Sequence, residues 1–270
     1  MPTVLGLCWH LYSDQNRTTV GNRMADITLT VKRTGDTDDS GSYWQSFTVP
    51  EIAETMSVLD ALIWTQQNIE PTLAFRRACR VKMCGTCGVR INGREGLACG
   101  TLVRSLVGDR GGEVRVEPMR HLPVVRDLVT DPGVFYQRLN QVGAAFTPKD
   151  DSLEPAQILP DSKERKTINP HRECIYCGLC YSACSVAGLD SGYLGPAALN
   201  RAFALVSDSR DGTGKQRLQA SAGDHGIWRC HTIFECTAVC PKGIPITEAI
   251  EGLKRKVFVN KLKSLIGLGR

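Results

Sequence analysis

The feature that most constrains this chain of 270 residues is its set of twelve cysteines. Four lie between Cys79 and Cys99, seven lie between Cys174 and Cys240, and Cys8 stands alone near the N-terminus. The first residues lack the basic segment and the small-residue cleavage site of a secretory signal, so we expect the thiols to be reduced. Grouped cysteines in a reducing compartment predict metal or redox chemistry rather than disulfide bonds.

Composition excludes several classes of protein. Hydrophobic residues make up 42% of the chain, which excludes a disordered protein and allows one or two domains with real cores. No segment approaches the ~18 consecutive apolar residues that a transmembrane helix needs. The formal net charge is +5, but the basic residues are dispersed and only 6% of residues are aromatic, which is a poor match to a nucleic-acid surface.

The patterning divides the chain near residue 122, and we expect an α+β protein. Residues 1–24 are expected to form an N-terminal extension. In residues 25–122, alternating apolar residues from Ile27 predict a strand, and Asn92-Gly93 predicts a hairpin turn. A capping box starting at Ser57 predicts a helix. Residues 101–106 and 113–119 are expected to be further strands. Residues 123–270 show helical spacing, in segments 123–129, 135–146 and 195–206 and in a last helix from about residue 245.

The first cysteine group predicts a [2Fe–2S] cluster. Cys79, Cys84, Cys87 and Cys99 follow the pattern C-x4-C-x2-C-x11-C, whose first spacings are those of plant-type ferredoxins. Gly85 and Gly88 are expected to let the backbone approach the cluster closely and to adopt positive φ. The alternative is a structural zinc site, although zinc is usually held by two short cysteine pairs rather than by one asymmetric loop.

The second group has the reciprocal spacing of a two-cluster ferredoxin, in which the fourth cysteine of each run binds the other cluster. The run CIYCGLCYSAC is followed by the related run CHTIFECTAVC. The reciprocal rule assigns one [4Fe–4S] cluster to Cys174, Cys177, Cys180 and Cys240. It leaves three cysteines for the other cluster, namely Cys184, Cys230 and Cys236.

The second run lacks one ligand, because Ile233 stands where the pattern requires cysteine. An isoleucine side chain has no atom that can bind iron, so a [3Fe–4S] cluster is the natural outcome. The alternative is a four-iron cluster with water or hydroxide at its open corner. Three thiolates and an apolar corner would raise the reduction potential of this cluster. A raised reduction potential suits the last electron acceptor in a series of clusters.

With these motifs the sequence resembles the iron–sulfur (B) subunit of succinate dehydrogenase and fumarate reductase, respiratory complex II. The resemblance spans about residues 25–258. It rests on the segments RRACRVKMCGTC, INGREGLAC, EPMRHLPVVRDLV, CIYCGLC, GPAALNRAF, DSRD and RCHTIFECTAVCPKGI.

The resemblance implies an N-terminal β-grasp 2Fe–2S ferredoxin-like domain over residues 25–122. It also implies a C-terminal α-helical, bacterial-ferredoxin-like domain over residues 123–270, which carries the 4Fe–4S and 3Fe–4S clusters. Electrons would pass from the FAD of a flavoprotein subunit through the three clusters to quinone at a membrane anchor, with or without haem b. The chain would then have no dicarboxylate site of its own. It would lie peripherally on the cytoplasmic face of the membrane.

The resemblance also suggests residues near the quinone. His231, Ile233 and Lys254 match family positions, and Ser185 lies in the same neighbourhood. His231 could instead donate a hydrogen bond to a cluster sulfide, and Lys254 could belong to a solvated basic face. Ser185 and Leu189 replace the proline and tryptophan of ubiquinone-reducing members, so menaquinone is at least as plausible as ubiquinone.

Three other functions compete with succinate:quinone oxidoreduction. The first is the same subunit in a fumarate reductase that works in the reverse direction. The second is a zinc-dependent nucleic-acid-binding protein, which the CxxC pairs and the pI of about 8.6 favour. The third is the iron–sulfur subunit of another oxidoreductase, such as a relative of heterodisulfide reductase or glycolate oxidase. The order of the two cysteine groups argues against this third function.

Overall fold

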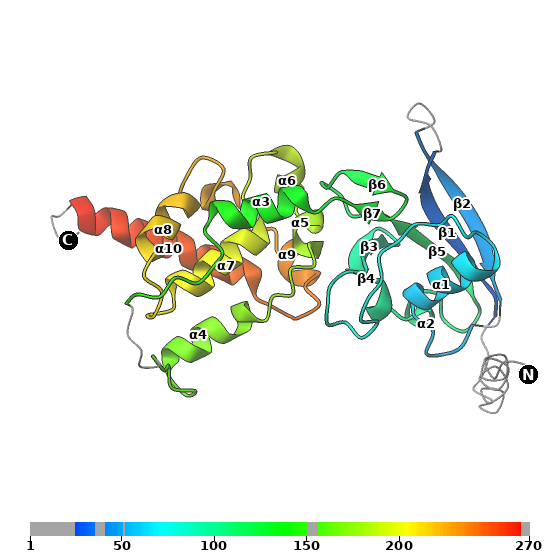
Figure 1. Cartoon of the computed structure of the whole chain (residues 1–270), viewed down its shortest axis with the longest axis horizontal. Helices are drawn as coiled ribbons and strands as arrows, with labels where there is room; N and C mark the ends of the chain where they lie inside the picture. Colours follow the sequence, from blue (N-terminus) through cyan, green and yellow to red (C-terminus); the bar gives the residue numbers. More distant parts are fainter. Residues whose placement is uncertain (1–24, 36–40, 51, 151–155, 266–270) are drawn as a thin grey trace, which may run out of the picture.

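The computed structural model describes residues 25–35, 41–50, 52–150 and 156–265. The extension expected at residues 1–24, with Cys8, lies outside these described residues. The chain folds into a sheet-containing unit and a helical unit that lie side by side (Figure 1). This arrangement confirms the expected α+β class.

The first unit is built on a five-stranded mixed sheet. The strands are β1 (Ile27–Thr34), β2 (Ser42–Val49), β3 (Gly88–Ile91), β4 (Arg94–Leu97) and β5 (Gly112–Glu117), in the order β2-β1-β5-β3-β4. Strand β1 is antiparallel to β2 and parallel to β5. The alternating residues Leu29 and Val31 of β1 are fully buried, because one face of the sheet covers the core.

The helix α1 (Val58–Asn68) packs against the sheet and begins at the predicted capping box. The Asp60 amide donates to Ser57 Oγ at 3.2 Å, and the Ser57 amide donates to Asp60 Oδ2 at 3.1 Å. Such reciprocal bonds satisfy amides that the first turn of a helix leaves unpaired. Leu59 and Leu62 then bury the apolar face of the helix.

Two expected elements are wrong. Residues 101–106 do not form a strand, because α2 (Val103–Val107) occupies this segment after the short 3-10 helix η1 (Ala98–Gly100). Residues 123–129 do not form a helix, because β6 (Val124–Arg126) and β7 (Val129–Thr130) form a small hairpin there. The turn residue Asp127 has φ of 48°, and its carboxylate accepts the amide protons of Thr34 and Ala74. Distant backbone amides therefore hold this turn, and no local spacing could reveal them.

The second unit is helical and surrounds α7 (Pro196–Val206), which packs against α3, α4, α8 and α10. The other helices are α3 (Gly133–Gln141), α4 (Lys163–Arg172), α5 (Leu179–Ala183), α6 (Ser185–Leu189), α8 (Gly214–Ser221), η2 (Ile227–Arg229), α9 (Glu235–Ala238) and α10 (Ile246–Leu265). None of the helices in the described ranges is both long and apolar enough to cross a membrane.

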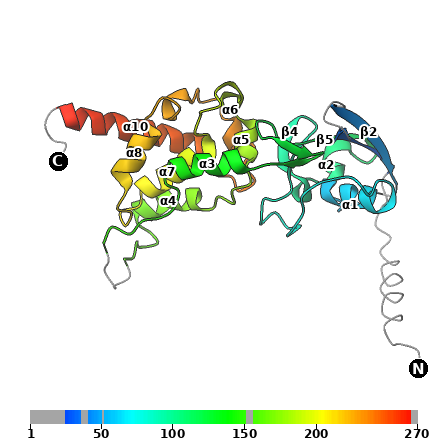
Figure 2. The ribbon, with the colours of Figure 1, turned by 45° about the horizontal axis from the view of Figure 1, so that its top comes forward.

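The two units lie next to each other (Figure 2), and their side chains pack together where they meet. Leu179, Ala183 and Val239 of the helical unit pack in the same apolar core as the sheet. Beside them, the buried carboxylate of Glu95 on β4 accepts hydrogen bonds from Arg120 Nε and from Ser182 Oγ, both at 3.1 Å. This interface combines apolar burial with a bonded carboxylate, and it determines how the cysteine loops of the two units face each other.

We expect Glu95→Ala to lower the free energy of unfolding by about 1–3 kcal/mol, because it leaves the buried Ser182 hydroxyl and Arg120 without their shared acceptor. Chemical denaturation of the intact chain measures this loss. Glu113→Ala is the matched control, because Glu113 pairs with Arg115 on the exposed sheet surface. Such exposed pairs contribute ~0–1 kcal/mol. Equal losses in the two variants would contradict a bonding role for Glu95.

Candidate metal centres

The four cysteines of the first group come together at one end of the sheet unit. Cys79, Cys84 and Cys87 lie on the loop between α1 and β3, and Cys99 lies in η1 after β4. The hairpin β3–β4 returns the chain so that the Cys99 amide faces Cys87 Sγ at 3.5 Å. The Lys82 amide contacts Cys99 Sγ at 3.4 Å from the other side. The predicted hairpin turn at Asn92-Gly93 thus delivers the distant fourth cysteine to the loop.

Backbone amides of this loop point at sulfur. The amides of Val81, Met83 and Cys84 lie 3.5, 3.3 and 3.3 Å from Cys79 Sγ. Arg80 and Lys82 both have φ of 61°, so the loop contains non-glycine residues in a conformation that side chains disfavour. Alternating conformations of this kind form a concave nest of amides that favours negative charge. The sequence contains no clear signal for this nest.

The glycines of the loop differ from the prediction in one respect. Gly85 has φ of +72°, as expected. Gly88 does not have positive φ, because it lies in strand β3. Its small size still matters, since a Cβ there would lie 3.2 Å from Met119 Sδ and 3.3 Å from the Cys177 carbonyl.

The thiols of the first loop lie in contrasting environments. A hydrogen bond from the Thr86 side chain, together with backbone hydrogen bonds, lowers the pKa of Cys84 to about 6. Burial raises the pKa of Cys87 to about 12. The pKa values of two neighbouring thiols in this loop are thus shifted in opposite directions.

In the helical unit, four cysteines line one cavity, and they are Cys174, Cys177, Cys180 and Cys240. Cys180 lies on α5 and Cys240 follows α9, so residues far apart in the chain converge here. Tyr176, between the first two cysteines, has φ of 53°. The cysteines that line this cavity are those that the reciprocal spacing groups together.

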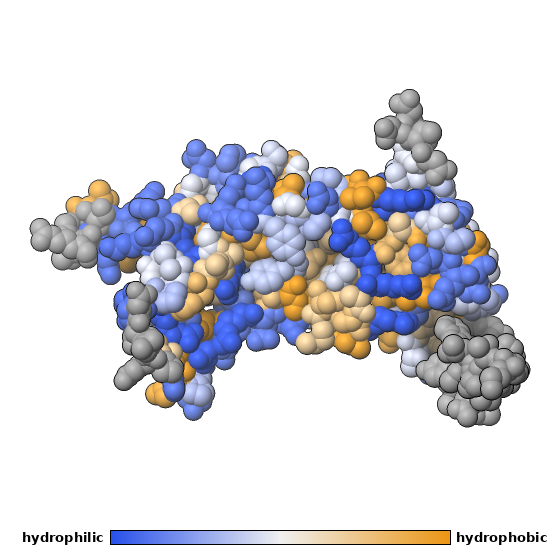
Figure 3. Space-filling model, in the orientation of Figure 1, coloured by the Kyte–Doolittle hydropathy of each residue, from blue (hydrophilic) through white to orange (hydrophobic). Residues whose placement is uncertain are grey.

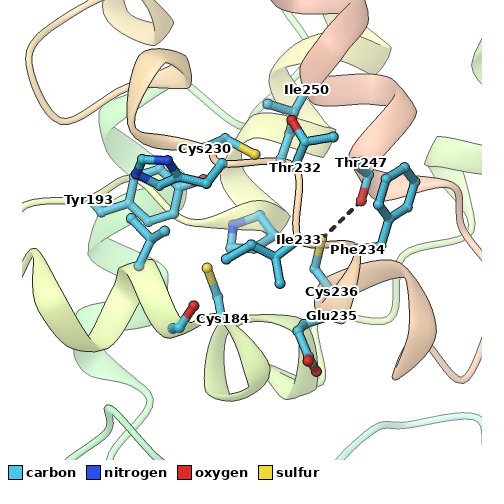
Figure 4. Close-up of a pocket in the computed structure, with 14 residues that line it drawn as sticks. Cys184, Tyr193, Cys230, Thr232, Ile233, Phe234, Glu235, Cys236, Thr247 and Ile250 are labelled. Carbon is cyan, nitrogen blue, oxygen red and sulfur yellow. Dashed lines mark hydrogen bonds between the residues drawn. The ribbon is translucent and has the colours of Figure 1, made fainter.

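A second cavity of the helical unit is lined by Cys184, Cys230 and Cys236 (Figure 4). Ser185, His231 and Ile233 line the same cavity, and the Ile233 side chain lies among the three cysteines. Ile233 is 53% exposed, so this side of the cavity opens to the surface. Among the described residues, no other cysteine lines this cavity.

Lys254 does not lie on a solvated basic face, so that alternative is wrong. Its side chain is only 19% exposed, and Nζ donates to the Cys230 carbonyl at 3.0 Å and to Glu251 Oε1 at 2.9 Å. The lysine therefore fastens α10 to the segment that carries Cys230. Lys254 is not among the residues that line the cavity.

Sequence reasoning missed two side chains of this cavity. Thr247, at the start of α10, is buried, and its hydroxyl contacts Cys236 Sγ at 3.5 Å. Tyr193 is buried as well, and burial together with the nearby Cys230 raises its pKa. Both lie outside the cysteine motifs, so only the packing of α10 and of the loop before α7 reveals them.

The donor sets fit clusters better than single ions. Zinc holds its ligands about 2.3 Å from one ion, and within the described ranges no three Cys, His, Asp or Glu side chains converge on a point in this way. The seven cysteines of the helical unit line two cavities instead. Burial raises the pKa of five of their thiols, namely Cys174, Cys177, Cys180, Cys184 and Cys236. Iron bound there would supply the positive charge that a buried thiolate needs.

The three groups of cysteines lie next to one another. Gly85 in the first loop packs on Cys177, and a Cβ at Gly85 would lie only 2.6 Å from Cys177 Cβ. Cys180, which lines the same cavity as Cys177, lies close enough to Cys236 for their charges to interact. The group that lines the Cys174–Cys240 cavity therefore lies next to both of the other cysteine groups.

Comparison with known families gives two matches. A model of a 2Fe-2S iron-sulfur cluster binding domain matches residues 28–137, and a model of a 4Fe-4S dicluster domain matches residues 171–244. The chain is also 36% identical to the fumarate reductase iron-sulfur subunit of Mycobacterium tuberculosis over 244 residues, which is 90% of this chain and 97% of the relative.

This chain belongs to the family of succinate dehydrogenase and fumarate reductase iron–sulfur subunits. It is 39% identical to a mitochondrial succinate dehydrogenase [ubiquinone] iron-sulfur subunit from Dictyostelium discoideum, over 73% of this chain and 70% of the relative. It is 34% identical to the fumarate reductase subunit of Haemophilus influenzae, over 78% of this chain and 85% of the relative. A chain of the Mycobacterium smegmatis Sdh1 complex superposes with a TM-score of 0.78 at 31% identity, over 88% of this chain and 98% of the other.

Family membership has two consequences. The chain is an electron-transfer subunit with a two-iron cluster domain and a four-iron dicluster domain. The zinc-dependent nucleic-acid-binding alternative is therefore wrong.

We expect Gly85→Ala to weaken the contact between the two cysteine loops, because the added methyl group overlaps Cys177 and φ is positive. Overpacking and backbone strain each cost about 1–3 kcal/mol. Gly93→Ala is the matched control, since Gly93 has φ of +81° but a Cβ there would meet only the end of the Arg90 side chain at 3.7 Å. Thermal unfolding should separate the two variants. An unfolding temperature that falls equally in both would show that strain, and not the contact with Cys177, matters.

Proposed function

We propose that this chain conducts electrons between the FAD of a flavoprotein subunit and quinone at a membrane anchor. The clusters supply the one-electron redox steps when they are bound. The residues of the chain hold the clusters in a row and bury the middle one. Its relatives are named as iron-sulfur subunits of two enzymes, succinate dehydrogenase and fumarate reductase, which supports this proposal.

The ligand assignment follows the three cysteine groups. We assign the [2Fe–2S] cluster to Cys79, Cys84, Cys87 and Cys99. We assign the [4Fe–4S] cluster to Cys174, Cys177, Cys180 and Cys240. The [3Fe–4S] cluster falls to Cys184, Cys230 and Cys236. The domain boundary proposed between residues 122 and 123 separates the two-iron cluster from the other two.

One observation carries the three-iron assignment. Three cysteines line the second cavity of the helical unit, and Ile233 lies among them where a fourth ligand would stand. An aliphatic side chain leaves the corner without a thiolate, which favours the three-iron form and a raised potential. The four-iron form with an exchangeable water is the alternative that experiment must exclude.

The same cavity is the proposed neighbour of the quinone. Ser185, His231 and Ile233 line it, and Ile233 and Phe234 are each 53% exposed beside it. His231 is the residue that we expect to hydrogen-bond a quinone oxygen or a cluster sulfide. Lys254 would act indirectly, through the Cys230 carbonyl. The acceptor that we propose is a quinone. Because Ser185 and Leu189 depart from the ubiquinone-type pattern, menaquinone is a candidate as well as ubiquinone.

Succinate oxidation is the direction that we propose, with the chain peripheral to the membrane on its cytoplasmic face. The reverse direction, fumarate reduction, is equally consistent with the names of the relatives. Assays of the assembled complex with succinate plus quinone, and with fumarate plus quinol, decide between the two directions.

We expect Ile233→Cys to convert the three-iron site into a four-iron site, because it supplies the missing thiolate. The EPR signal of the oxidised three-iron cluster should disappear, and the midpoint potential of the site should fall. Ile233→Val is the matched control and should keep the signal. Persistence of the signal in Ile233→Cys would contradict the ligand assignment.

Iron and sulfide analysis of the anaerobically purified chain should give about nine irons per chain and no stoichiometric zinc. Cys236→Ala should lose up to about three of these irons, because it removes a proposed ligand of one cluster. Cys8→Ser is the control, since Cys8 belongs to none of the ligand sets, and its iron content should not change. A wild-type value of two or three zinc ions per chain would overturn the proposal.

A further inference from the structure

The last turns of α10 leave the body of the helical unit. Up to Val257 the helix buries apolar residues, including Ile250 and Leu253, against the unit. Beyond Val257 the apolar residues are exposed, with Phe258 at 64%, Leu262 at 48% and Leu265 at 83%. This end of the helix protrudes beyond α8 (Figure 1), and apolar surface is visible beside the C-terminal tail (Figure 3).

The three exposed side chains share one face of the helix. Phe258, Leu262 and Leu265 are spaced by four and three residues, which places them in a single row along a helix. We call this row the α10 stripe. Val259, 46% exposed, widens it on one side. A row of exposed apolar side chains indicates a surface that binds a partner or a membrane.

The surroundings of the α10 stripe are strongly basic. The last 19 residues, after Glu251, contain six lysines and arginines and no acidic residue. Arg255, Lys261 and Lys263 are exposed and flank the stripe. Lys261 and Lys263 form no ion pair within the part of the chain that the structure describes. The charge of this end is therefore available to an anionic partner.

We propose that the C-terminal half of α10 binds directly to the surface of an anionic lipid bilayer. An apolar row flanked by basic residues is the pattern of helices that lie in the membrane interface, with the row inserted and the cations at the phosphates. The α10 stripe is convex, at the end of a protruding helix, and so suits a fluid layer that closes around it. The inference is independent of the membrane anchor, which is a protein.

The α10 stripe lies on the same helix as two residues that line the Cys184–Cys230–Cys236 cavity. Thr247 and Ile250, near the start of α10, line the Cys184–Cys230–Cys236 cavity. A helix rises ~1.5 Å per residue, so Leu265 lies about 27 Å from Thr247 along the axis. Lipid contact at the far end of α10 would hold the open side of this cavity beside the bilayer. This consequence rests on the proposed function, whereas lipid binding itself is tested without quinone or anchor.

The experiment is co-sedimentation of the full chain, purified anaerobically with its clusters, with protein-free vesicles. Vesicles of phosphatidylcholine are compared with vesicles that contain roughly one third phosphatidylglycerol. We expect binding to the anionic vesicles only, and we expect it to weaken when salt rises from ~0.05 M to ~0.5 M. Failure to bind the anionic vesicles at low salt would overturn the proposal, and would point to a protein partner for the stripe.

Two variants and their controls test the mode of binding. Phe258→Ser with Leu262→Ser should weaken binding about tenfold, whereas Val124→Ser with Val125→Ser changes two exposed residues on β6 and should not. Arg255→Gln with Lys261→Gln and Lys263→Gln should weaken it by on the order of fivefold per charge. Lys149→Gln with Lys163→Gln and Lys166→Gln is the matched control, since these lysines are also exposed. Equal losses in test and control variants would overturn the proposal.

The vesicle assay separates this inference from the proposed function. Each variant is first checked for unchanged iron content and for the unchanged EPR signal of its clusters, so that loss of binding is not loss of fold. Intact clusters without vesicle binding would refute the lipid contact alone. Vesicle binding by a chain without the three-iron signal would instead refute part of the proposed function.

Discussion

The contact between the first cysteine loop and Cys177 is the constraint on which the rest of the structure depends. Gly85 touches Cys177, which is one of the cysteines of the middle cavity, and no residue with a Cβ fits there without displacement. The contact exists only because the sheet unit docks on α5 and α9 through Leu179, Ala183 and the Glu95 hydrogen bonds. Docking places two cysteine groups next to each other, which the proposed passage of electrons from one cluster to the next requires.

The cysteine loops are in conformations and environments that a chain without iron would disfavour. Arg80, Lys82, Tyr176, Thr232 and Phe234 all have positive φ, and all lie between cysteines of the proposed ligand sets. Burial raises the pKa of most thiols in the helical unit, so the thiolates that iron binds are unfavourable there without a cation. Strain of this kind persists only where the surroundings over-determine it. We infer that cluster binding and folding of these loops stabilise each other.

Local patterns predicted the elements whose stabilising contacts lie nearby. The capping box at Ser57, the hairpin turn at Asn92-Gly93 and the helical spacing of residues 195–206 each depend on neighbours within a few residues, and the structure contains all three elements. The helix predicted for residues 123–129 is wrong, because the apolar spacing there resembles that of a helix. The contacts that decide the structure are distant in the chain, since the Asp127 carboxylate accepts hydrogen bonds from the amides of Thr34 and Ala74. The strand predicted for residues 101–106 is wrong for a related reason. The Val103 amide donates a hydrogen bond to the distant Met56 carbonyl, and the segment forms the short helix α2.

The sequence alone determined the chemistry of this protein. Cysteine spacing grouped eleven residues into three sets, and Ile233 was conspicuous because a metal ligand requires a donor atom that isoleucine lacks. Tertiary structure alone decided which groups are adjacent, that Thr247 reaches Cys236, that Lys254 bonds the Cys230 carbonyl, and that the α10 stripe is left exposed. The physical reason is range. The spacing of cysteines along one or two loops is enough to identify a ligand set. The order of the cysteine groups in space and the exposure of a helix face depend instead on docking between segments that are distant in the chain.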